Sequence, residues 1–552
     1  MSTAPRHALP RAVVVGAALA VLVAVLLFAN VLPLGIPGEW EWPYWPSDAG
    51  PSLTRLALLP PVLLGPLLLA ALRTGARRAL RRWETGLVLA GVAVLHALLL
   101  VVGIPAVTPP GWPQVPAAVR VGQLVASDGA FAYYGAALKA GDAGTLLATH
   151  EQMMADPATP DRIRTHPPGP PLVYLAILRA FDSLPYSTTR TLERTLGLAA
   201  FQGETLRAAV RGPLPLHLSP HEALGAVVCG YATALLGALA IIPVFLLGNE
   251  IGGQRVGLAA ACVYAVTPSA LVFVPAIDPW VTALAATCLW LTLAAARRGS
   301  LWLAAAAGTA LWAALQVSFG AIALVPIGGL VLLLLRGRQI RRCALLVGPF
   351  VAVPVVLSLL VWGVTSYNTF HAFTLSQAAH GGVTARRTYL PWVAMDPLDF
   401  IFGFGVCASV CAMVATRSCI AVWRGWMRQA LPSHPGHAVD SDAAPAEGTS
   451  RPAPLPSGEG SDLGPTPPFW PRPDAALLVA ALATLLLLDL SGTVRGEVAR
   501  IWQFLMPLLL VPAAAWLARV SPRFAPTVLV LLACQLLQAL AMQANVAFMV
   551  PW

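Results

Sequence analysis

Apolar runs of about twenty residues recur along this chain, and short turns that carry arginine separate them. A helix of that length matches the hydrocarbon thickness of a lipid bilayer. Only 11% of the residues are charged and 57% are hydrophobic, whereas soluble domains carry about a quarter charged residues. The mean hydropathy of +0.72 agrees with this contrast. We therefore expect an all-α integral membrane protein, built as a polytopic bundle of transmembrane helices.

The charge balance of the chain indicates topology. The formal net charge is +10 and the isoelectric point is about 9.6, a combination that also occurs in proteins that bind nucleic acid. Here the arginines form short clusters between apolar runs, so we expect no nucleic-acid partner. The 8 cysteines lie in or beside apolar runs, which predicts neither a disulfide framework nor a zinc site.

Basic turns alternate with acidic or neutral turns, as they do when the basic loops stay in the cytoplasm. This alternation predicts about thirteen spans. The first run, about 12–34, is longer than a signal-peptide core and lacks a cleavage site, so we expect it to remain as an anchor. The third, about 85–107, leads to a long outer loop. In a cytoplasmic (inner) membrane, the N-terminus is therefore predicted to be cytoplasmic and the C-terminus extracytoplasmic.

The spans and loops give a predicted division of the chain. The loops outside the membrane are expected to carry short amphipathic helices. Residues 429–473 are rich in Pro, Ser, Gly, Ala and acidic residues, which cannot bury a core. The predicted regions are three N-terminal transmembrane helices (1–107), a first large extracytoplasmic loop (108–221), a transmembrane core (222–364), a second extracytoplasmic loop (365–398), a transmembrane helix with its cytoplasmic end (399–428), a disordered cytoplasmic linker (429–473) and C-terminal transmembrane helices (474–552).

Several charged or polar residues fall in the turns predicted to lie outside the membrane. Ionisable groups at the edge of hydrocarbon are costly, so their gathering on one face predicts a polar cavity. Arginines there would bind a phosphate through forked hydrogen bonds. A carboxylate would take a proton from a hydroxyl. The candidates are Asp128 as catalytic base, with His166, Asp278, Arg387, Tyr389, Arg495, Glu497 and Arg500 as substrate- or phosphate-binding residues.

Each candidate also has a purely structural interpretation. Asp128 precedes an aromatic helix and could simply cap it, and Asp278 before Pro279 is a good N-cap. His166 lies among prolines, which indicate rigidity rather than catalysis. Arg495 and Arg500 could bind lipid headgroups without specificity. The pair at 386–387 could be solvated. These alternatives stay open at this point.

The order of these motifs resembles the GT-C superfamily of membrane glycosyltransferases, and most of all family 39, the dolichyl-phosphate-mannose mannosyltransferase type with its bacterial relatives. The resemblance covers roughly 123–335 well. Many relatives show two adjacent acids at the first motif, where this chain has Asp128 and Gly129, and two extra spans precede the family core. The motifs are Ser127-Asp128-Gly129 to Tyr134, His166 to Ala180, Thr267-Pro268 and Asp278-Pro279, with 387–400 and 495–507 resembling later segments at lower specificity.

The resemblance implies a polyprenyl-phosphate-sugar-dependent hexosyl- or pentosyltransferase that inverts the anomeric carbon outside the cytoplasm. Asp128 would be the base, His166 would lie beside the donor phosphate or the acceptor, and Arg495 or Arg500 would offset the phosphate charge. The partners would be the lipid-linked sugar donor, a glycan, lipid or protein acceptor, and membrane lipids. No cofactor or metal site is indicated, although a divalent ion would also offset phosphate charge. The alternative is a multi-span lipid or polysaccharide transporter or flippase. Transporters commonly contain internal repeats, and we find no convincing repeat between the halves of this sequence.

Overall fold

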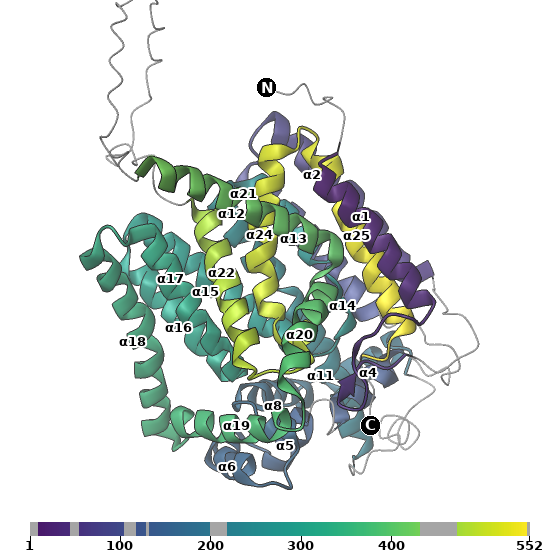
Figure 1. Cartoon of the computed structure of the whole chain (residues 1–552). Coiled ribbons are helices and arrows are strands. Elements are labelled where there is room, and N and C mark those ends of the chain that lie inside the picture. Colours follow the sequence, from purple (N-terminus) through teal and green to yellow (C-terminus); the bar gives the residue numbers. More distant parts are fainter. Residues whose placement is uncertain are drawn as a thin grey trace, which may run out of the picture.

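The computed structural model describes residues 9–44, 55–103, 117–127, 132–198, 218–430 and 472–548. Helices form almost all of these ranges, and the one sheet within them is a hairpin of two short strands, β1 (Gly35–Ile36) and β2 (Trp40–Glu41). Upright helices make a bundle, and shorter helices lie across one of its ends (Figure 1). The chain is thus an all-α, membrane-embedded protein. The greater part of the predicted linker 429–473 lies outside the described residues.

Within the described ranges, nine helical segments are long and apolar enough to cross a membrane, or ten if one bent pair counts as a span. The predicted count of thirteen is not confirmed. The nine segments are α1 (Arg11–Phe28), Arg82–Gly103 with α3 (Arg82–Leu98), Pro220–Gly252 with α11 (Pro220–Ala238) and α12 (Ile241–Gly252), α15 (Asp278–Arg298), Phe319–Arg336 with α17 (Leu324–Arg336), α18 (Ile340–Thr365), α22 (Pro473–Ser491), Gln503–Val520 with α24 (Met506–Val520), and α25 (Phe524–Asn545).

Two stretches that were expected to be spans do not form a single helix of spanning length, for local reasons. The stretch before Asp278 is divided into α13 (Gln254–Tyr264) and α14 (Pro268–Val272), because Pro268 is suited to begin a helix but not to continue one. The helix after α15, α16 (Leu301–Val317), ends where Ser318 caps the next short turn through Gly320 N–H, 3.3 Å from its Oγ. A further helix, α2, covers Arg55–Arg77.

The bent pair is formed by α20 (Tyr389–Phe404) and α21 (Val406–Ala430), which meet at 110°. Gly405 lies at the bend with φ +93°, a backbone conformation that glycine adopts without strain. Its surroundings leave no room for a side chain, since a Cβ there would lie 1.6 Å from Gln535 Oε1. The Gln535 side chain donates to Phe404 O at 2.8 Å. Glycine and glutamine together therefore fix the bend against α25.

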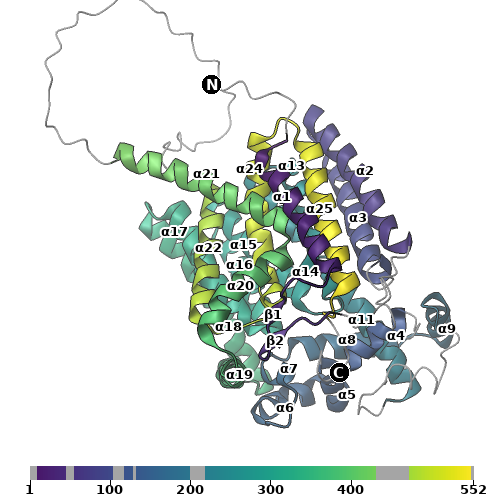
Figure 2. The same ribbon diagram turned by 45° about the vertical axis from the view of Figure 1, so that its right-hand side comes forward.

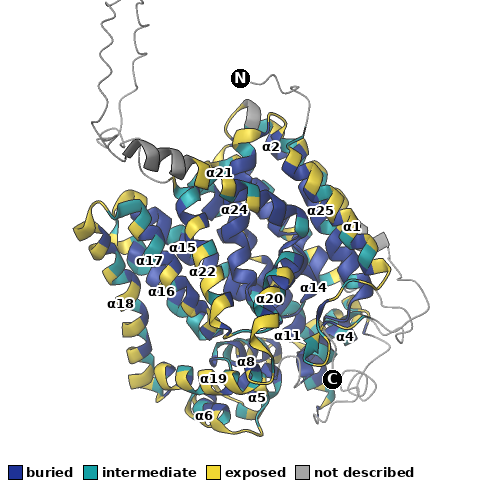
Figure 3. Ribbon diagram, in the orientation of Figure 1, coloured by how far each residue is buried: buried dark blue, intermediate teal, exposed yellow. Residues whose placement is uncertain are grey.

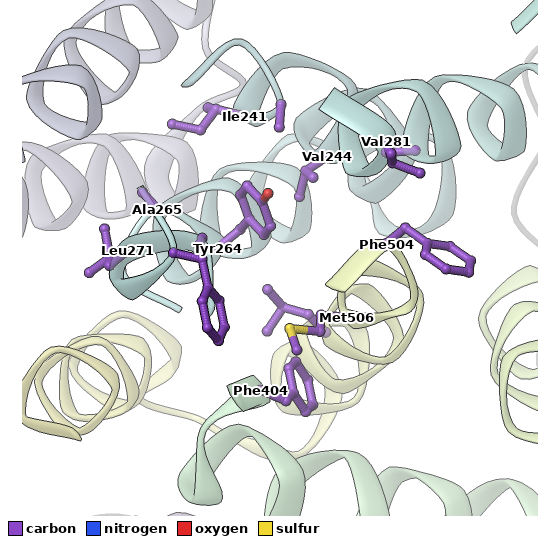
Figure 4. Packing of buried hydrophobic residues seen from close by; sticks show 14 of the residues in the cluster. Ile241, Val244, Tyr264, Ala265, Leu271, Val281, Phe404, Phe504 and Met506 are labelled. Atoms are coloured by element: carbon purple, nitrogen blue, oxygen red, sulfur yellow. The ribbon is translucent and has the colours of Figure 1, made fainter. Parts of the chain in front are cut away.

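The apolar core lies where α12, α13, α14, α15, α20 and α24 meet (Figure 4). Side chains from all of these helices are buried there, including Tyr264, Leu271, Phe404 and Met506. Exposure divides the helices into central and peripheral ones (Figure 3). In the apolar window of Gln503–Val520, 83% of the residues are buried inside the protein, but only 22% are buried in that of α18. The outer face of α18 therefore suits contact with lipid.

One end of the bundle, the covered end, is defined by the helices that lie across it (Figures 1 and 2). Parts of the predicted outer loops 108–221 and 365–398 form them, together with the hairpin that follows α1. They are α4 (Ala117–Ala126), α5 (Tyr133–Ala140), α6 (Ala143–Ala155), α7 (Asp161–Arg164), α8 (Gly169–Asp182), α9 (Tyr186–Thr195) and α19 (Thr369–Thr384).

The opposite end, the basic end, carries the helix termini rich in arginine. Arg297 and Arg298 at the end of α15 reach Glu250, with ion-pair distances of 3.2 and 3.1 Å. Arg519 at the end of α24 pairs with Asp474 at 2.7 Å. This end is strongly positive, because acidic residues are outnumbered there by arginines. They include Arg81, Arg82, Arg255, Arg336, Arg338, Arg341, Arg342 and Arg523.

Candidate functional site

The loop between α22 and the short helix α23 (Val498–Ile501) lies at the covered end and has an unusual backbone. Gly496 has φ +79°, and Glu497 has φ +60°, a left-handed conformation that is uncommon for a residue with a side chain. Such a conformation costs about 1–2 kcal/mol and persists where the surroundings impose it. Two carboxylates of α20 impose it here: Asp396 accepts from Gly496 N–H at 2.8 Å, and Asp399 from Ala499 N–H at 3.0 Å.

Three arginines from separate parts of the chain converge on the Glu497 carboxylate. Arg162 of α7 approaches it to 3.3 Å, Arg387 before α20 to 4.0 Å, and Arg500 of α23 donates to it directly. Arg500 also lies 4.0 Å from the Asp278 carboxylate at the start of α15. We call these five residues the ionic cluster. It joins four of the residues predicted from the sequence, Asp278, Arg387, Glu497 and Arg500, with Arg162, which was not predicted.

The ionic cluster holds three guanidinium groups and two carboxylates. Burial raises the pKa of the Glu497 carboxyl, but Arg500, Arg162 and Arg387 outweigh burial and lower that pKa to about 2. Glu497 therefore stays ionised at neutral pH. With both carboxylates charged, the cluster has one more positive group than negative groups. Of the Arg500 side chain only 5% is exposed, and its Nε finds no hydrogen-bond partner among the described residues.

His166 lies beside the ionic cluster. Its ring contacts that of Tyr133 edge-on, with 5.7 Å between the ring centres, and its Nδ1 is 3.0 Å from Thr165 Oγ. Burial, with Arg162, Arg500 and His380 nearby, lowers the pKa of His166 to about 3. The imidazole is therefore neutral at physiological pH and can accept or donate a hydrogen bond. A cationic ring would add to the positive charge of the arginines.

The covered end fixes His166 through contacts on both sides. The buried His150 of α6 donates from Nε2 to the His166 carbonyl at 3.0 Å, and Ser376 of α19 donates to the Thr165 carbonyl at 2.8 Å. At the start of α8, a Cβ on Gly169 would lie 1.9 Å from Gln316 O, so only glycine allows this approach to α16. The predicted Thr-His-Pro-Pro-Gly motif thus rigidly connects the helices of the covered end to the upright helices of the bundle.

Asp128, the predicted base, lies outside the described residues, as does 129–131. Its described neighbours lie close to the site. Ser127 is buried, and its carbonyl accepts from Ala132 N–H at 3.0 Å. Tyr133 follows directly and contacts His166. Of the described residues next to this segment, Tyr133 thus belongs to the site.

Arg495 and Tyr389, both predicted from the sequence, stabilise the 492–497 loop and are not part of the ionic cluster. The Arg495 side chain donates to the carbonyls of Gly492 and Thr384 at 3.2 and 3.0 Å and to that of Arg387, while Arg387 donates to the Arg495 carbonyl. Tyr389 lies under the Arg495 guanidinium, 5.4 Å from ring centre to Cζ, and donates to Leu490 O at 2.5 Å. Both residues hold the 492–497 loop against the start of α20.

Sequence reasoning missed Arg162, Tyr133 and His380 as members of this site. Arg162 precedes His166 by four residues, and this closeness to the predicted histidine was the available signal. His380 of α19 lies beside the Thr493 backbone, and burial lowers its pKa. Among the described residues, no group of three or more His, Cys, Asp or Glu side chains could hold a metal ion.

Comparisons with known proteins give no name to this arrangement: no family model, curated protein or solved structure matches the chain.

Proposed function

We propose that this chain is an integral-membrane glycosyltransferase that moves a sugar from a polyprenyl phosphate to an acceptor at the covered end. The observation that carries the proposal is the convergence of Arg162, Arg387 and Arg500 around Glu497 at one end of an apolar bundle. A lipid phosphate is an anion that a bilayer presents at that depth. Guanidinium groups suit it because they remain charged and bind phosphate oxygens in pairs.

In the proposed reaction, the acceptor hydroxyl oxygen bonds to the anomeric carbon from the face opposite the phosphate. The bond from that carbon to the phosphate oxygen breaks, and polyprenyl phosphate leaves with the electron pair. The hydroxyl proton passes to the Asp128 carboxylate. The sugar passes through an oxocarbenium-like state, as in inverting glycoside chemistry. The arginines would stabilise the charge that develops on the leaving phosphate.

The test is transfer of radiolabelled sugar from a short-chain polyprenyl-phosphate donor by purified protein, wild type beside Asp128→Asn. Loss of a general base lowers rates by about 10²–10⁴-fold, so we expect the variant to lose nearly all transfer. Asp182→Asn is the matched control, since Asp182 is an exposed carboxylate at the same end, paired with His221 at 2.8 Å. Full activity in Asp128→Asn would refute the assigned base.

The rival proposal is a transporter or flippase, and the same preparation tests it. Lipid-linked sugar that crosses liposomes containing the protein, with no transfer from any donor, would favour the rival. The location of the arginines at one end argues for interfacial chemistry, because transporters place their sites near the bilayer midplane. We further propose that the basic end faces the cytoplasm and the covered end faces outward, as the positive-inside rule requires.

A further inference from the structure

We infer that Glu39 is a positioning residue, which holds the Arg387 guanidinium against Glu497 from a hairpin far away in the sequence. The inference rests on the proposed function only for its consequence, which is that Arg387 binds phosphate. The hairpin formed by β1 and β2 has the three-residue turn Pro37-Gly38-Glu39, in which Gly38 has φ +83°. Turns of this length commonly place glycine in the left-handed region.

The Glu39 carboxylate accepts three hydrogen bonds from the start of α20. Thr388 donates its backbone N–H to Oε2 at 2.8 Å and its hydroxyl to Oε1 at 2.7 Å, and Trp392 donates its indole N–H to Oε2 at 2.7 Å. These bonds lower the pKa of Glu39, which keeps the carboxylate ionised. A carboxylate with three donors is a strong connection between two segments that lie far apart in the sequence.

The connection places Arg387, the residue just before Thr388, between two aromatic rings. The Arg387 Cζ lies 5.5 Å from the centre of the Trp40 ring and 5.8 Å from that of Trp392. Trp40 directly follows Glu39, so one hairpin supplies both the carboxylate and one of the rings. Stacking on tryptophan leaves the edge of a guanidinium free to bind carboxylate or phosphate. Here that edge is directed toward Glu497 at 4.0 Å.

The hairpin itself is anchored on its other side. Tyr44 donates to Leu32 O at 2.9 Å, and Ala547 N–H, just beyond α25, donates to Pro43 O at 2.8 Å. Trp42 donates to Asp399 Oδ1 at 3.4 Å, and Asp399 also caps Ala499. The hairpin therefore contacts both the Arg387 side and the Glu497 side of the ionic cluster.

The first experiment measures binding of farnesyl phosphate, a short prenyl monophosphate, to purified variants in detergent. We expect Glu39→Ala to weaken binding about tenfold, because it removes the three hydrogen bonds that hold Thr388 and Trp392 beside Arg387. Glu39→Gln keeps an acceptor oxygen for Thr388 and Trp392 and should bind within about twofold of wild type. Glu41→Gln is the matched control, an exposed carboxylate on the same hairpin. In an Arg387→Ala background, Glu39→Ala should add little, because both changes remove the same interaction.

The second experiment needs no ligand. Hydrogen exchange of the 492–500 loop, which Glu39 does not bond to directly, should accelerate in Glu39→Ala but not in Glu39→Gln or Glu41→Gln. Unchanged exchange in Glu39→Ala, or its full binding of farnesyl phosphate, would overturn the inference. If the wild-type protein neither transfers sugar nor binds farnesyl phosphate, the proposed function fails, and the exchange measurement still decides whether Glu39 positions the loop.

Discussion

Glu497 is surrounded by more positive charge than it can neutralise. Removing its charge leaves Arg162, Arg387 and Arg500 without their shared acid. Breaking a fully buried ion pair on one side costs roughly 3–5 kcal/mol, and the cost is smaller here because 21% of the Glu497 side chain is exposed. We therefore expect Glu497→Gln to lower the midpoint of thermal unfolding in detergent by several degrees and to abolish the proposed activity. Glu41→Gln, on the exposed hairpin, serves as the control. An unchanged midpoint would mean that solvent already screens these charges.

His166 makes stability depend on pH in a defined direction. Its pKa is lowered to about 3 in the folded protein, below the ordinary histidine value of about 6.5. Between these two values the unfolded chain binds the proton and the folded chain does not, so stability rises with pH and is lost on acidification. We expect His166→Gln to reduce the fall in unfolding midpoint between pH 7 and pH 5. Part of the slope should remain, because burial also lowers the pKa of His150 to about 4. An identical slope in variant and wild type would contradict this.

At the residue scale, the sequence predicted charged residues of the ionic cluster but not their individual contacts. Charge is so scarce in this chain that Asp278, Glu497 and Arg500 are conspicuous by position alone. Arg495 is equally conspicuous, yet its guanidinium binds backbone carbonyls. The left-handed backbone at Glu497 decides that Arg500, and not Arg495, binds the Glu497 carboxylate. The residue type at position 497 does not predict that conformation.

At the element scale, the loop before α23 depends on the absence of a side chain at Gly496. An added Cβ would lie 2.9 Å from Arg387 Nη1 and 3.0 Å from both the Trp40 and Trp392 rings. We expect Gly496→Ala to destabilise the protein by roughly 3 kcal/mol, through backbone strain and the displaced rings. Gly38→Ala has a similar positive φ, +83°, but open space around its Cβ. It should cost only about 1 kcal/mol.

Thermal unfolding of the two glycine variants measures this difference in stability, and equal losses would show that strain alone matters at Gly496.

Interruptions of helices at proline, as at Pro268, follow from local chemistry. The sequence nevertheless predicted one span through that region, because hydropathy averages over the break. After the break, α13 packs against α24 and α14 against α25, which lie more than two hundred residues later.

At the scale of the whole molecule, the two ends of the bundle differ in charge and in covering. Cysteine labelling tests their orientation. Ser187→Cys in α9 at the covered end and Gln339→Cys before α18 at the basic end are both exposed positions. We expect a membrane-impermeant maleimide to label Ser187→Cys on spheroplasts and Gln339→Cys only after permeabilisation. The reverse pattern would invert the proposed topology, and a cysteine-free background removes labelling of native thiols.

The helical, membrane-embedded class could be predicted from the sequence because the hydrocarbon thickness sets a length that apolar runs either reach or miss. The number of spans could not. A run such as α16 is apolar enough but ends at Ser318, and α20 with α21 uses an apolar run to make a bend of 110°. These departures depend on neighbouring helices, such as the Gln535 contact at Gly405.

The ionic cluster can be completed only late in the synthesis of the protein. Arg162 and Glu497 are 335 residues apart, and at about 5–20 residues per second the ribosome needs on the order of half a minute to bridge that interval. Until then Arg162 and Asp278 have emerged without the acid and base that later pair with them. Insertion of the final helices is therefore the event that completes the cluster, and a chain that stops before residue 497 would leave its insertion machinery with Arg162 exposed at the covered end without Glu497.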